Sequence, residues 1–438
     1  MITILAFAFV IGVLVFVHEL GHYLAARRVG IRVLTFSVGF GPKVVGFSHG
    51  GTDYAISAIP LGGYVKMAGE TVEDQRTGAP DEFLSKSKWQ RFQVLIAGPA
   101  MNIGLAIVLL WVVLVQGADI PAYRDMAPVV GAVETPSPAA AAGLQVGDRI
   151  LRVDDRDVAT WEDFLMAVGG KAHREVTLLV EHNGDRRAVA LVPKAKGKYE
   201  VGDVGVFPKT HPHVRSVNVG DPAEKAGFKS NDVVLAVEGQ TISFAQQLSE
   251  QINKHTGQPI TVRVARAGQP LDLHVTPVKR GTVGMIGISI SDEVTRIEPG
   301  VLEALQMSVT QNWDATKLIF RTLGGLFTGE TSPKQLMGPV GIAQLSGESA
   351  KIGLFSLLAL MASISLNLGL LNLMPIPVLD GGHITIMALE GLARRDFSVR
   401  VKERMLLAGF VLLMLLMVTV IYNDLARTGW AEHLLFWR

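Results

Sequence analysis

His18 and His22 lie four positions apart in the segment His18-Glu19-Leu20-Gly21-His22. On an α-helix, residues i and i+4 lie on the same face, so both imidazoles could bind one metal ion. Glu19 would lie about 100° around the helix, close enough to act on a water bound to that ion. This pattern is typical of zinc hydrolases. Because the chain has no cysteine, zinc would need imidazole and carboxylate ligands.

A catalytic zinc site usually has three protein ligands and one open position, so a third ligand is expected elsewhere. Asp380 is a candidate, in the sequence NLMPIPVLDGGH. Pro375 and Pro377 cannot continue a hydrogen-bonded helix, and Gly381 and Gly382 allow the backbone to approach a partner closely. An aspartate in such a loop can equally be a turn residue or a helix N-cap. The residues alone leave its role open.

Apolar residues make up 49% of the chain, and the mean hydropathy is +0.33. A transmembrane helix needs about 20 apolar residues. The first apolar stretch could instead be a signal peptide, but no basic residues precede it and no small-residue cleavage site follows Val17. We therefore predict four spans: Ile2–Ala26, Phe92–Val115, Ile352–Met374 and Met405–Tyr422.

Short loops rich in Lys and Arg face the cytoplasm. The connections between the first two predicted spans and between the last two are rich in such residues, so both are predicted to be cytoplasmic. The long segment between the second and third spans, and both termini, would then face the opposite side. The formal net charge of +1 gives no indication of a nucleic-acid partner. The Lys and Arg residues of the two connections predicted to be cytoplasmic are Arg27, Arg28, Arg32, Lys43, Lys86, Lys88, Arg91, Arg394, Arg395, Arg400, Lys402 and Arg404.

The long segment contains a duplication. Gly143 and Gly227 occupy equivalent positions 84 residues apart, and so do Asp148 and Asp232. A period this long indicates two tandem domains rather than a solenoid, whose repeats are about 20–50 residues. The pattern PAxxAGLxxGDxIxxV resembles the PDZ domain, whose members bind a peptide end at a sheet edge. Either copy could equally be a spacer or gate without a peptide ligand.

The motifs together resemble the site-2 protease family of intramembrane zinc metalloproteases. HExxH in the first span and NxxPxPxLDGG after the third carry this resemblance. It implies that Asp380 is the third zinc ligand beside His18 and His22, with Glu19 as general base. His383 falls outside the ligand position and is interpreted as a local hydrogen-bonding residue. Further family motifs are GPAMN at 98–102, GPVGI at 338–342 and IPLGGYVKM at 59–67.

Two tandem PDZ copies narrow the resemblance to the bacterial sigma-E-regulating type. That resemblance implies a multi-pass protein of the bacterial inner membrane, with the PDZ domains and both termini periplasmic and the active site near the cytoplasmic side. The implied substrates are single-span membrane proteins, namely an anti-sigma factor in a stress response and remnant signal peptides. Zn²⁺ is the implied cofactor, and the surrounding partner is membrane lipid.

Substrate contacts are expected at two places. The segment 61–67, with Gly62, Gly63, Tyr64 and Val65, could pair as an edge strand with an extended substrate. Asn367 and Asn372 resemble the family's substrate-contacting asparagines, although hydrogen bonds between helices would also explain them. The segment 301–326 has apolar residues at helical spacing, which favours an amphipathic helix on the membrane surface or a packed helix.

The predicted fold is a polytopic α-helical membrane protein with four transmembrane helices, a membrane-associated β-rich loop and two inserted α+β PDZ domains. A membrane scaffold that only presents PDZ domains is an alternative, but it would need no Glu19 beside the two histidines. A transporter is a further alternative that the lack of a span repeat disfavours. The predicted boundaries are 1–117 for the first two spans and loop, 118–208 and 209–291 for the PDZ copies, 292–351 for a connecting segment and 352–438 for the last two spans.

Overall fold

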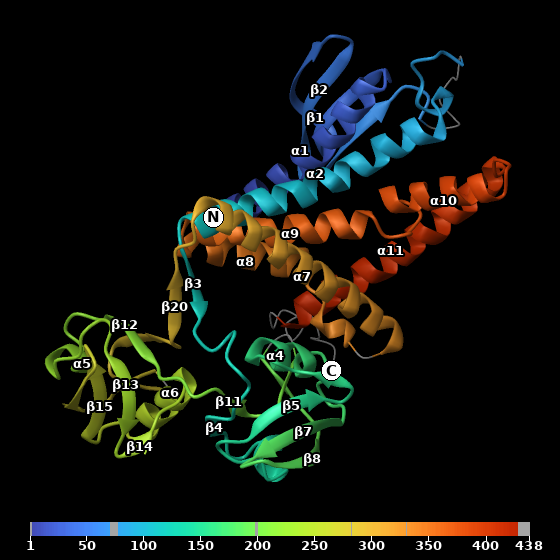
Figure 1. The fold of residues 1–438 in the computed structure, drawn as a ribbon. Helices are drawn as coiled ribbons and strands as arrows, with labels where there is room; N and C mark the ends of the chain where they lie inside the picture. The colour runs from blue at the N-terminus through green and yellow to red at the C-terminus, as the bar shows by residue number, and fades with distance from the viewer. Residues whose placement is uncertain (1, 71–77, 198–199, 282, 330, 428–438) are drawn as a thin grey trace, which may run out of the picture. The chain divides into compact units, whose positions relative to one another are not determined.

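The computed structural model describes residues 2–70, 78–197, 200–281, 283–329 and 331–427 (Figure 1). The chain divides into two compact units. The membrane unit comprises 1–117, 298–326 and 336–438, and the repeat unit comprises 118–297 and 327–335. Each unit has its own apolar cores. The predicted periplasmic termini, Met1 and 428–438, lie outside the described residues.

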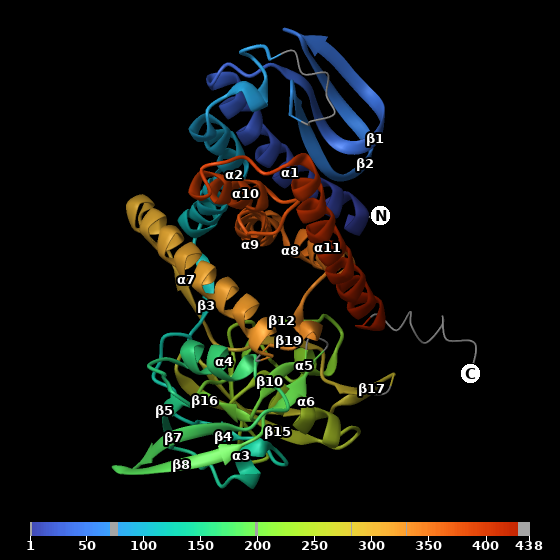
Figure 2. The same cartoon turned by 90° about the vertical axis from the view of Figure 1, so that its right-hand side faces the viewer.

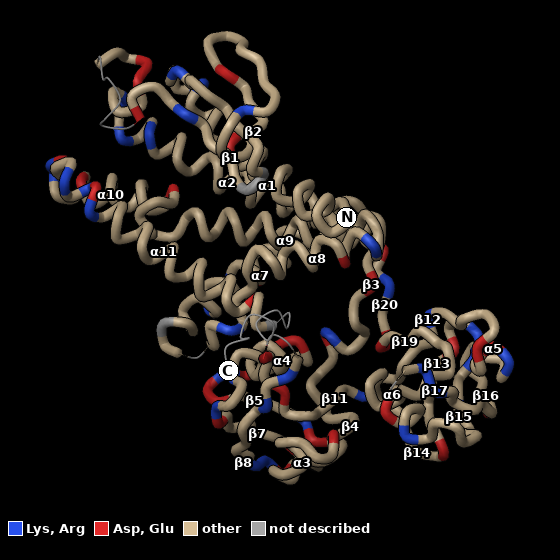
Figure 3. The backbone as a smooth tube through the Cα atoms, turned by 180° about the vertical axis from the view of Figure 1, so that it is seen from behind, with Lys and Arg blue, Asp and Glu red and all other residues tan. Residues whose placement is uncertain are grey.

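Within the described residues, four helices of the membrane unit are long and apolar enough to cross a membrane. They are α1 (Ile2–Arg28), α2 (Lys88–Val115), α9 (Leu354–Asn372) and α11 (Val399–Arg427). They correspond to the four predicted spans. Their central parts carry almost no Lys, Arg, Asp or Glu (Figure 3). This is what an apolar surrounding requires, because an unpaired charge there costs several kcal/mol.

Small residues bring three of these helices together. A Cβ added at Gly21 of α1 would lie 2.4 Å from the Ala97 carbonyl oxygen of α2. A Cβ at Gly369 of α9 would lie 2.9 Å from the Pro99 carbonyl oxygen, again on α2. Larger side chains would push the helices apart, so glycine sets the distance, as is common where membrane helices pack closely. α2 therefore lies against both α1 and α9.

Strands β1 (Val33–His49) and β2 (Thr52–Met67) form an antiparallel hairpin beside α1 (Figure 2). Apolar residues of β1 and β2, including Phe36 and Val65, pack with Ala26 of α1 in one cluster. Residues 53–56 of β2 pair with two parts of β1, residues 35–38 and 45–48, whereas residues 63–67 pair with residues 33–38 alone. Within the described residues, the end of β2 at 63–67 therefore has one edge without a strand partner. A short 3₁₀ helix, η1 (Phe83–Ser85), precedes α2. The predicted β-rich loop is thus present as a long hairpin.

The two repeats contain the same elements in the same order, most of them beginning 84 residues apart. Each has a short helix, a longer helix and antiparallel strands around its own core (Figure 1). The first repeat comprises β4 (Ala132–Val133), α3 (Pro138–Ala141), β5 (Arg149–Val153), β6 (Arg156–Asp157), α4 (Trp161–Gly169), β7 (Val176–His182), β8 (Asp185–Leu191), β9 (Lys194–Lys196), β10 (Val201–Asp203) and β11 (Val206–Phe207). The second comprises β12 (His213–Val217), α5 (Pro222–Lys225), β13 (Val233–Val237), β14 (Gln240–Thr241), α6 (Ala245–Lys254), β15 (Ile260–Arg266), β16 (Gln269–Val275), β17 (Val278–Arg280), β18 (Val283–Met285) and β19 (Ile288–Ser291).

The segment that connects the repeats to the third span is more structured than one amphipathic helix. β20 (Val294–Ile297) pairs antiparallel with β3 (Ala118–Pro121), so the two ends of residues 118–297 lie side by side. Helix α7 (Val301–Thr328), η2 (Pro333–Gln335) and α8 (Pro339–Ile352) follow.

Helix α7 corresponds to the predicted segment 301–326, and one of its faces packs against the spans. The Ser308 hydroxyl donates to the Ile107 carbonyl of α2 at 2.7 Å. Ala315 and Ile319 pack beside Ala106 of α2 and residues of α9. This is the packed-helix alternative. The opposite face still exposes large apolar side chains such as Leu302 and Trp313, and its position at a membrane surface stays a prediction.

The GPVGI motif forms the start of α8, and a carboxylate from α11 caps it. Asp424, near the end of α11, is buried, and its carboxylate accepts hydrogen bonds from the Gly338 and Gly341 N–H groups at 3.1 and 2.9 Å. These donors belong to the start of α8, where helix N–H groups lack partners within the helix. A carboxylate is favoured at that end of a helix, so Asp424 fixes α8 to α11.

Candidate metal centre

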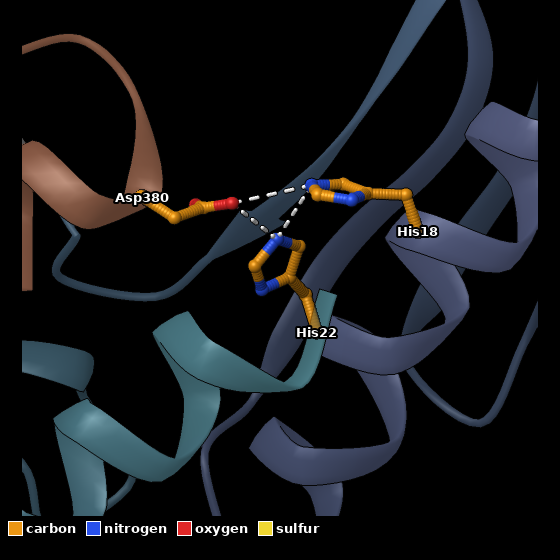
Figure 4. Close-up of side chains that lie close together, drawn as sticks. All are labelled: His18, His22 and Asp380. Atoms are coloured by element: carbon orange, nitrogen blue, oxygen red, sulfur yellow. Dashed lines mark hydrogen bonds and ion pairs between the residues drawn. The ribbon is translucent and has the colours of Figure 1, made fainter. Parts of the chain in front are cut away.

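The centre begins with the two histidines of α1. The i, i+4 spacing places His18 and His22 on the same side of the helix, and their Nε2 atoms lie 3.2 Å apart (Figure 4). Both residues are only 8% exposed. Room for His22 comes from α2, since a Cβ added at Gly98 would lie 2.3 Å from His22 Nε2. The close approach of α1 and α2 therefore encloses both rings.

Asp380 reaches the same point from far along the chain. It is the first residue of α10 (Asp380–Leu392), a helix that follows the loop after α9. Gly381 and Gly382 pack this first turn against the loop, because a Cβ at either position would lie 2.2 Å or 2.1 Å from the carbonyl oxygen of Leu373 or Ile376. The prediction that these glycines allow close approach is confirmed. Asp380 begins a helix, although the sequence had suggested a loop.

The loop before Asp380 is strained. Val378 has a φ of +118°, a conformation that β-branched residues rarely adopt. Strain of this kind costs about 1–3 kcal/mol and persists only where the surrounding structure imposes it. Here the packing of Gly381 and Gly382 on the loop supplies that constraint, and the turn directs the Asp380 side chain toward α1 (Figure 4).

The three candidate ligand atoms form a triangle. Asp380 Oδ2 lies 3.2 Å from His18 Nε2 and 3.4 Å from His22 Nε2, and the imidazoles are 3.2 Å apart. Zinc binds nitrogen and carboxylate oxygen at about 2.0–2.2 Å, so two ligands of a tetrahedral ion lie about 3.3 Å apart. The donor set and its spacing fit a zinc ion with three protein ligands. The fourth position would be free for water or substrate.

A cavity of about 220 Å³ adjoins this triangle. Of the residues predicted to act in catalysis or substrate binding, Glu19, Gly63, Tyr64, Val65 and Asn372 line it together with the three ligands. The Gly63 position lets β2 approach the base, because a Cβ there would lie 3.1 Å from Glu19 Cγ. The hairpin and the loop before α10 thus meet at the candidate base.

Two predicted residues lie elsewhere. Asn367 donates its side-chain amide to the Ser363 carbonyl of its own helix at 2.9 Å, and it is not among the residues that line the cavity. Gly62 is also outside the lining and has a φ of +108°, with the Phe40 ring 2.3 Å from an added Cβ. Its role in the structure is to let the hairpin backbone turn beneath that ring.

Two further groups at the site were not predicted from the sequence. The Val94 carbonyl oxygen of α2 lies 2.8 Å from His22 Nδ1 and accepts the proton of that nitrogen when Nε2 faces the ion. Glu70 lines the cavity, and its carboxylate accepts a hydrogen bond from the Met67 N–H at 3.0 Å. A backbone carbonyl has no sequence signature, and Glu70 follows the strand without any pattern that would single it out.

Comparison with known proteins agrees with this site. The model of peptidase family M50 matches residues 6–416. Protease RseP of Yersinia pestis is 34% identical, with 97% of this chain and 98% of that protein covered. The regulator of sigma E protease of Haemophilus influenzae is 35% identical, with 96% and 98% covered. A zinc metalloprotease of Vibrio cholerae is 33% identical, with 97% and 98% covered.

Among solved structures, the PDZ domain of an SdrC-like protein from Listeria monocytogenes covers 20% of this chain at 17% identity and a TM-score of 0.18, which supports no argument about the fold. The match to the family model, by contrast, extends over almost the whole chain and includes all three candidate ligands. The chain belongs to peptidase family M50, the site-2 protease family of zinc metalloproteases.

Proposed function

We propose that His18, His22 and Asp380 bind the catalytic zinc and that Glu19 is the general base of an endopeptidase that cuts membrane-spanning substrates within the bilayer. The observation that carries this proposal is the ligand triangle, with sides of 3.2, 3.2 and 3.4 Å, beside a cavity that Glu19 also lines. Zinc, when bound, supplies a Lewis acid that polarises the scissile carbonyl and makes water more acidic. Glu19 accepts the proton of the attacking water and returns it to the leaving amine.

The position of these groups in the chain supports cleavage within the membrane. His18, Glu19 and His22 belong to α1, one of the four helices able to span a bilayer. Ionisable residues at such depth are expensive to bury and are therefore functional as a rule. A scaffold would gain nothing from a carboxylate at Glu19 beside two imidazoles.

The decisive experiment is Glu19→Gln in the purified full-length protein, assayed on a single-span model substrate. Glutamine keeps the shape of the side chain and both imidazoles, so zinc content should match wild type. Cleavage should fall by about 10²-fold or more, the usual scale for losing general-base catalysis. Near-normal cleavage by this variant would contradict the assigned mechanism.

The substrate must be extended before attack, because a helix hides its peptide groups. We infer that the free edge of β2 at 63–67 pairs with the extended segment, since within the described residues this end of β2 has no strand partner on that side and Gly63, Tyr64 and Val65 line the cavity. Asn372 would contact the same segment. Asn367 has the weaker support, because its amide is already bonded within α9.

Proline at position 65 tests the edge strand. Val65→Pro removes a backbone N–H that an added strand would need and that hydrogen-bonds to Glu19 in this structure, and cleavage should fall while zinc content stays unchanged. Val65→Ala is the matched control, because it shortens the side chain and keeps the N–H. Equal cleavage by the two variants would mean that the hairpin has a structural role and does not pair with the substrate.

The relatives named as regulators of sigma E suggest the substrate class. We propose that this protein lies in the bacterial inner membrane and cleaves an anti-sigma factor, with remnant signal peptides as further substrates. The Lys and Arg residues of the two short connections support a cytoplasmic position for the metal centre and a periplasmic position for the repeats and both termini.

The two repeats are proposed to be PDZ domains, at 118–208 and 209–291, that act as a size filter. Two folded domains of about 80 residues each are a bulky obstacle for a substrate that still carries its outer domain. Deleting 128–290 should then allow cleavage of untrimmed substrates and leave trimmed substrates cut at a similar rate. Loss of trimmed-substrate cleavage by a folded, zinc-loaded deletion variant would instead identify the repeats as docking sites.

A further inference from the structure

Asn102 of α2 is fully buried beside the candidate ligand His18. Its side-chain Nδ2 lies 3.2 Å from His18 Nδ1, on the side of the ring that faces away from Asp380. Its exposure is 0%, and within the described residues its Oδ1 has no hydrogen-bond partner. A buried acceptor without a partner costs about 1–3 kcal/mol, so this position calls for an explanation beyond helix packing.

The chemistry of a metal-binding imidazole supplies that explanation. His18 directs Nε2 toward Asp380 and His22, so Nε2 is the nitrogen placed to bind zinc. A neutral imidazole that binds through Nε2 carries its proton on Nδ1 and donates it. The Asn102 NH₂ group is also a donor and cannot accept that proton. A half-turn of the amide exchanges its oxygen and nitrogen, which have nearly the same size, and places an acceptor on Nδ1.

We propose that Asn102 is a positioning residue for zinc binding, whose Oδ1 accepts the Nδ1–H of His18 and holds the ring with Nε2 toward the ion. This rests on the ligand set of the proposed function. The other histidine provides a parallel, because His22 Nδ1 lies 2.8 Å from the Val94 carbonyl oxygen. Val94 and Asn102 are eight residues apart on α2, about two helical turns, so one face of α2 serves both imidazoles.

Helix α9 fixes the backbone of Asn102. The Ser365 hydroxyl of α9 donates to the Asn102 carbonyl oxygen at 2.8 Å. Gly369, one turn further along α9, allows the contact, because a Cβ there would lie 3.4 Å from Asn102 Cβ. The third span thus supports the first through Asn102. Asn102, the last residue of the GPAMN motif, thus supports zinc binding in addition to the packing of the spans.

The test compares the zinc affinity of three full-length proteins by competition with a chromophoric chelator. Asn102→Leu keeps the volume and removes the acceptor, and its affinity should fall by about 10–100-fold, the usual effect of losing such a partner of a metal ligand. Asn102→Asp keeps an acceptor oxygen and should bind zinc within a few-fold of wild type. If the leucine variant does not fold, Asn102→Ala replaces it in the same comparison.

Wild-type affinity in Asn102→Leu would overturn the inference. So would an aspartate variant as weak as the leucine variant, because packing rather than the acceptor would then explain the loss. Asp380→Ala separates this result from the proposed function: if it binds zinc like wild type, the ligand set itself is wrong. If Asp380→Ala loses zinc and Asn102→Leu does not, only the role of Asn102 fails.

Discussion

Two aspartates, Asp232 in the repeat unit and Asp380 in the membrane unit, have different partners. In the second repeat, Asp232 is 0% exposed and accepts hydrogen bonds from Arg266 Nε and Nη2, both at 2.7 Å. In the membrane unit, Asp380 faces the two Nε2 atoms of His18 and His22. Within the described residues it forms no ion pair with Lys or Arg.

The difference separates a carboxylate with a structural ion pair from one that is a candidate metal ligand. A guanidinium donates hydrogen bonds to both carboxylate oxygens and carries a fixed positive charge, so no site for a metal cation remains. Two neutral imidazoles and a carboxylate, by contrast, present three lone pairs to one point and are completed by a metal ion. Asp148 of the first repeat is an intermediate case, since His182 Nδ1 at 2.6 Å and Arg187 Nη2 at 3.0 Å share it.

Removal of the proposed ligand carboxylate should have the largest effect. Asp380→Ala should lower zinc affinity by more than about 100-fold, since a direct ligand matters more than its supporting partners, and cleavage should be lost. Metal analysis of the purified protein and cleavage of a model substrate measure both. Asp232→Ala is the control and should keep its zinc. Full zinc content in Asp380→Ala would mean that another group, such as His383, is the ligand.

The second prediction concerns the space around His22. In Gly98→Ala the new methyl group would meet the His22 ring, since the added Cβ lies 2.3 Å from Nε2. The ring must shift, and zinc affinity should fall by roughly 10–100-fold. Gly104→Ala on the same helix is the matched control, because its Cβ would have no neighbour within 4 Å. Equal zinc affinity in the two variants would show that the helices separate easily.

The third prediction concerns the stability of the second repeat. Asp232→Ala leaves Arg266 without its carboxylate and should destabilise this repeat by about 1–3 kcal/mol, at the low end because the arginine side chain is 31% exposed. Thermal unfolding of the full-length protein measures the loss. Asp272→Ala breaks an exposed pair with Arg263 and should have no measurable effect. Equal losses of stability in the two variants would mean that burial of the carboxylate does not determine how much its ion pair stabilises the repeat.

The smallest expected effect is on acid stability. Burial of the Asp148 carboxyl raises its pKa, but hydrogen bonds from the Gln145 N–H, Arg187 and His182 outweigh this and leave the pKa below the usual value. A lowered pKa stabilises the fold above the unfolded pKa of about 3.9, and this contribution is lost as pH falls through the folded pKa. The first repeat should therefore lose stability below about pH 4. In Asp148→Asn that part of the acid dependence should be absent, and an unchanged acid profile would exclude Asp148 as its source.

Much of this protein could be predicted from local sequence. Long apolar runs, such as the one that became α2, predicted the spans because a bilayer requires about 20 apolar residues in a row. The 84-residue offset between Gly143 and Gly227 revealed the two repeats. The i, i+4 spacing of His18 and His22 placed both on one side of α1, since helical geometry follows from spacing alone.

The assembly of the site could not be predicted from spacing. Asp380 lies 358 positions after His22, and only the packing of α10 against α2 brings its carboxylate to 3.4 Å from His22 Nε2. The Val94 carbonyl and the Asn102 amide support the histidines because Gly21 and Gly369 let three helices approach closely. Asn367 and Asn372 show the same limit: five residues apart at the end of one helix, only Asn372 lines the cavity. Sequence determines which side chains a helix presents to one side, whereas tertiary packing decides which of them meet, because contacts between distant segments depend on the surfaces of all the helices at once.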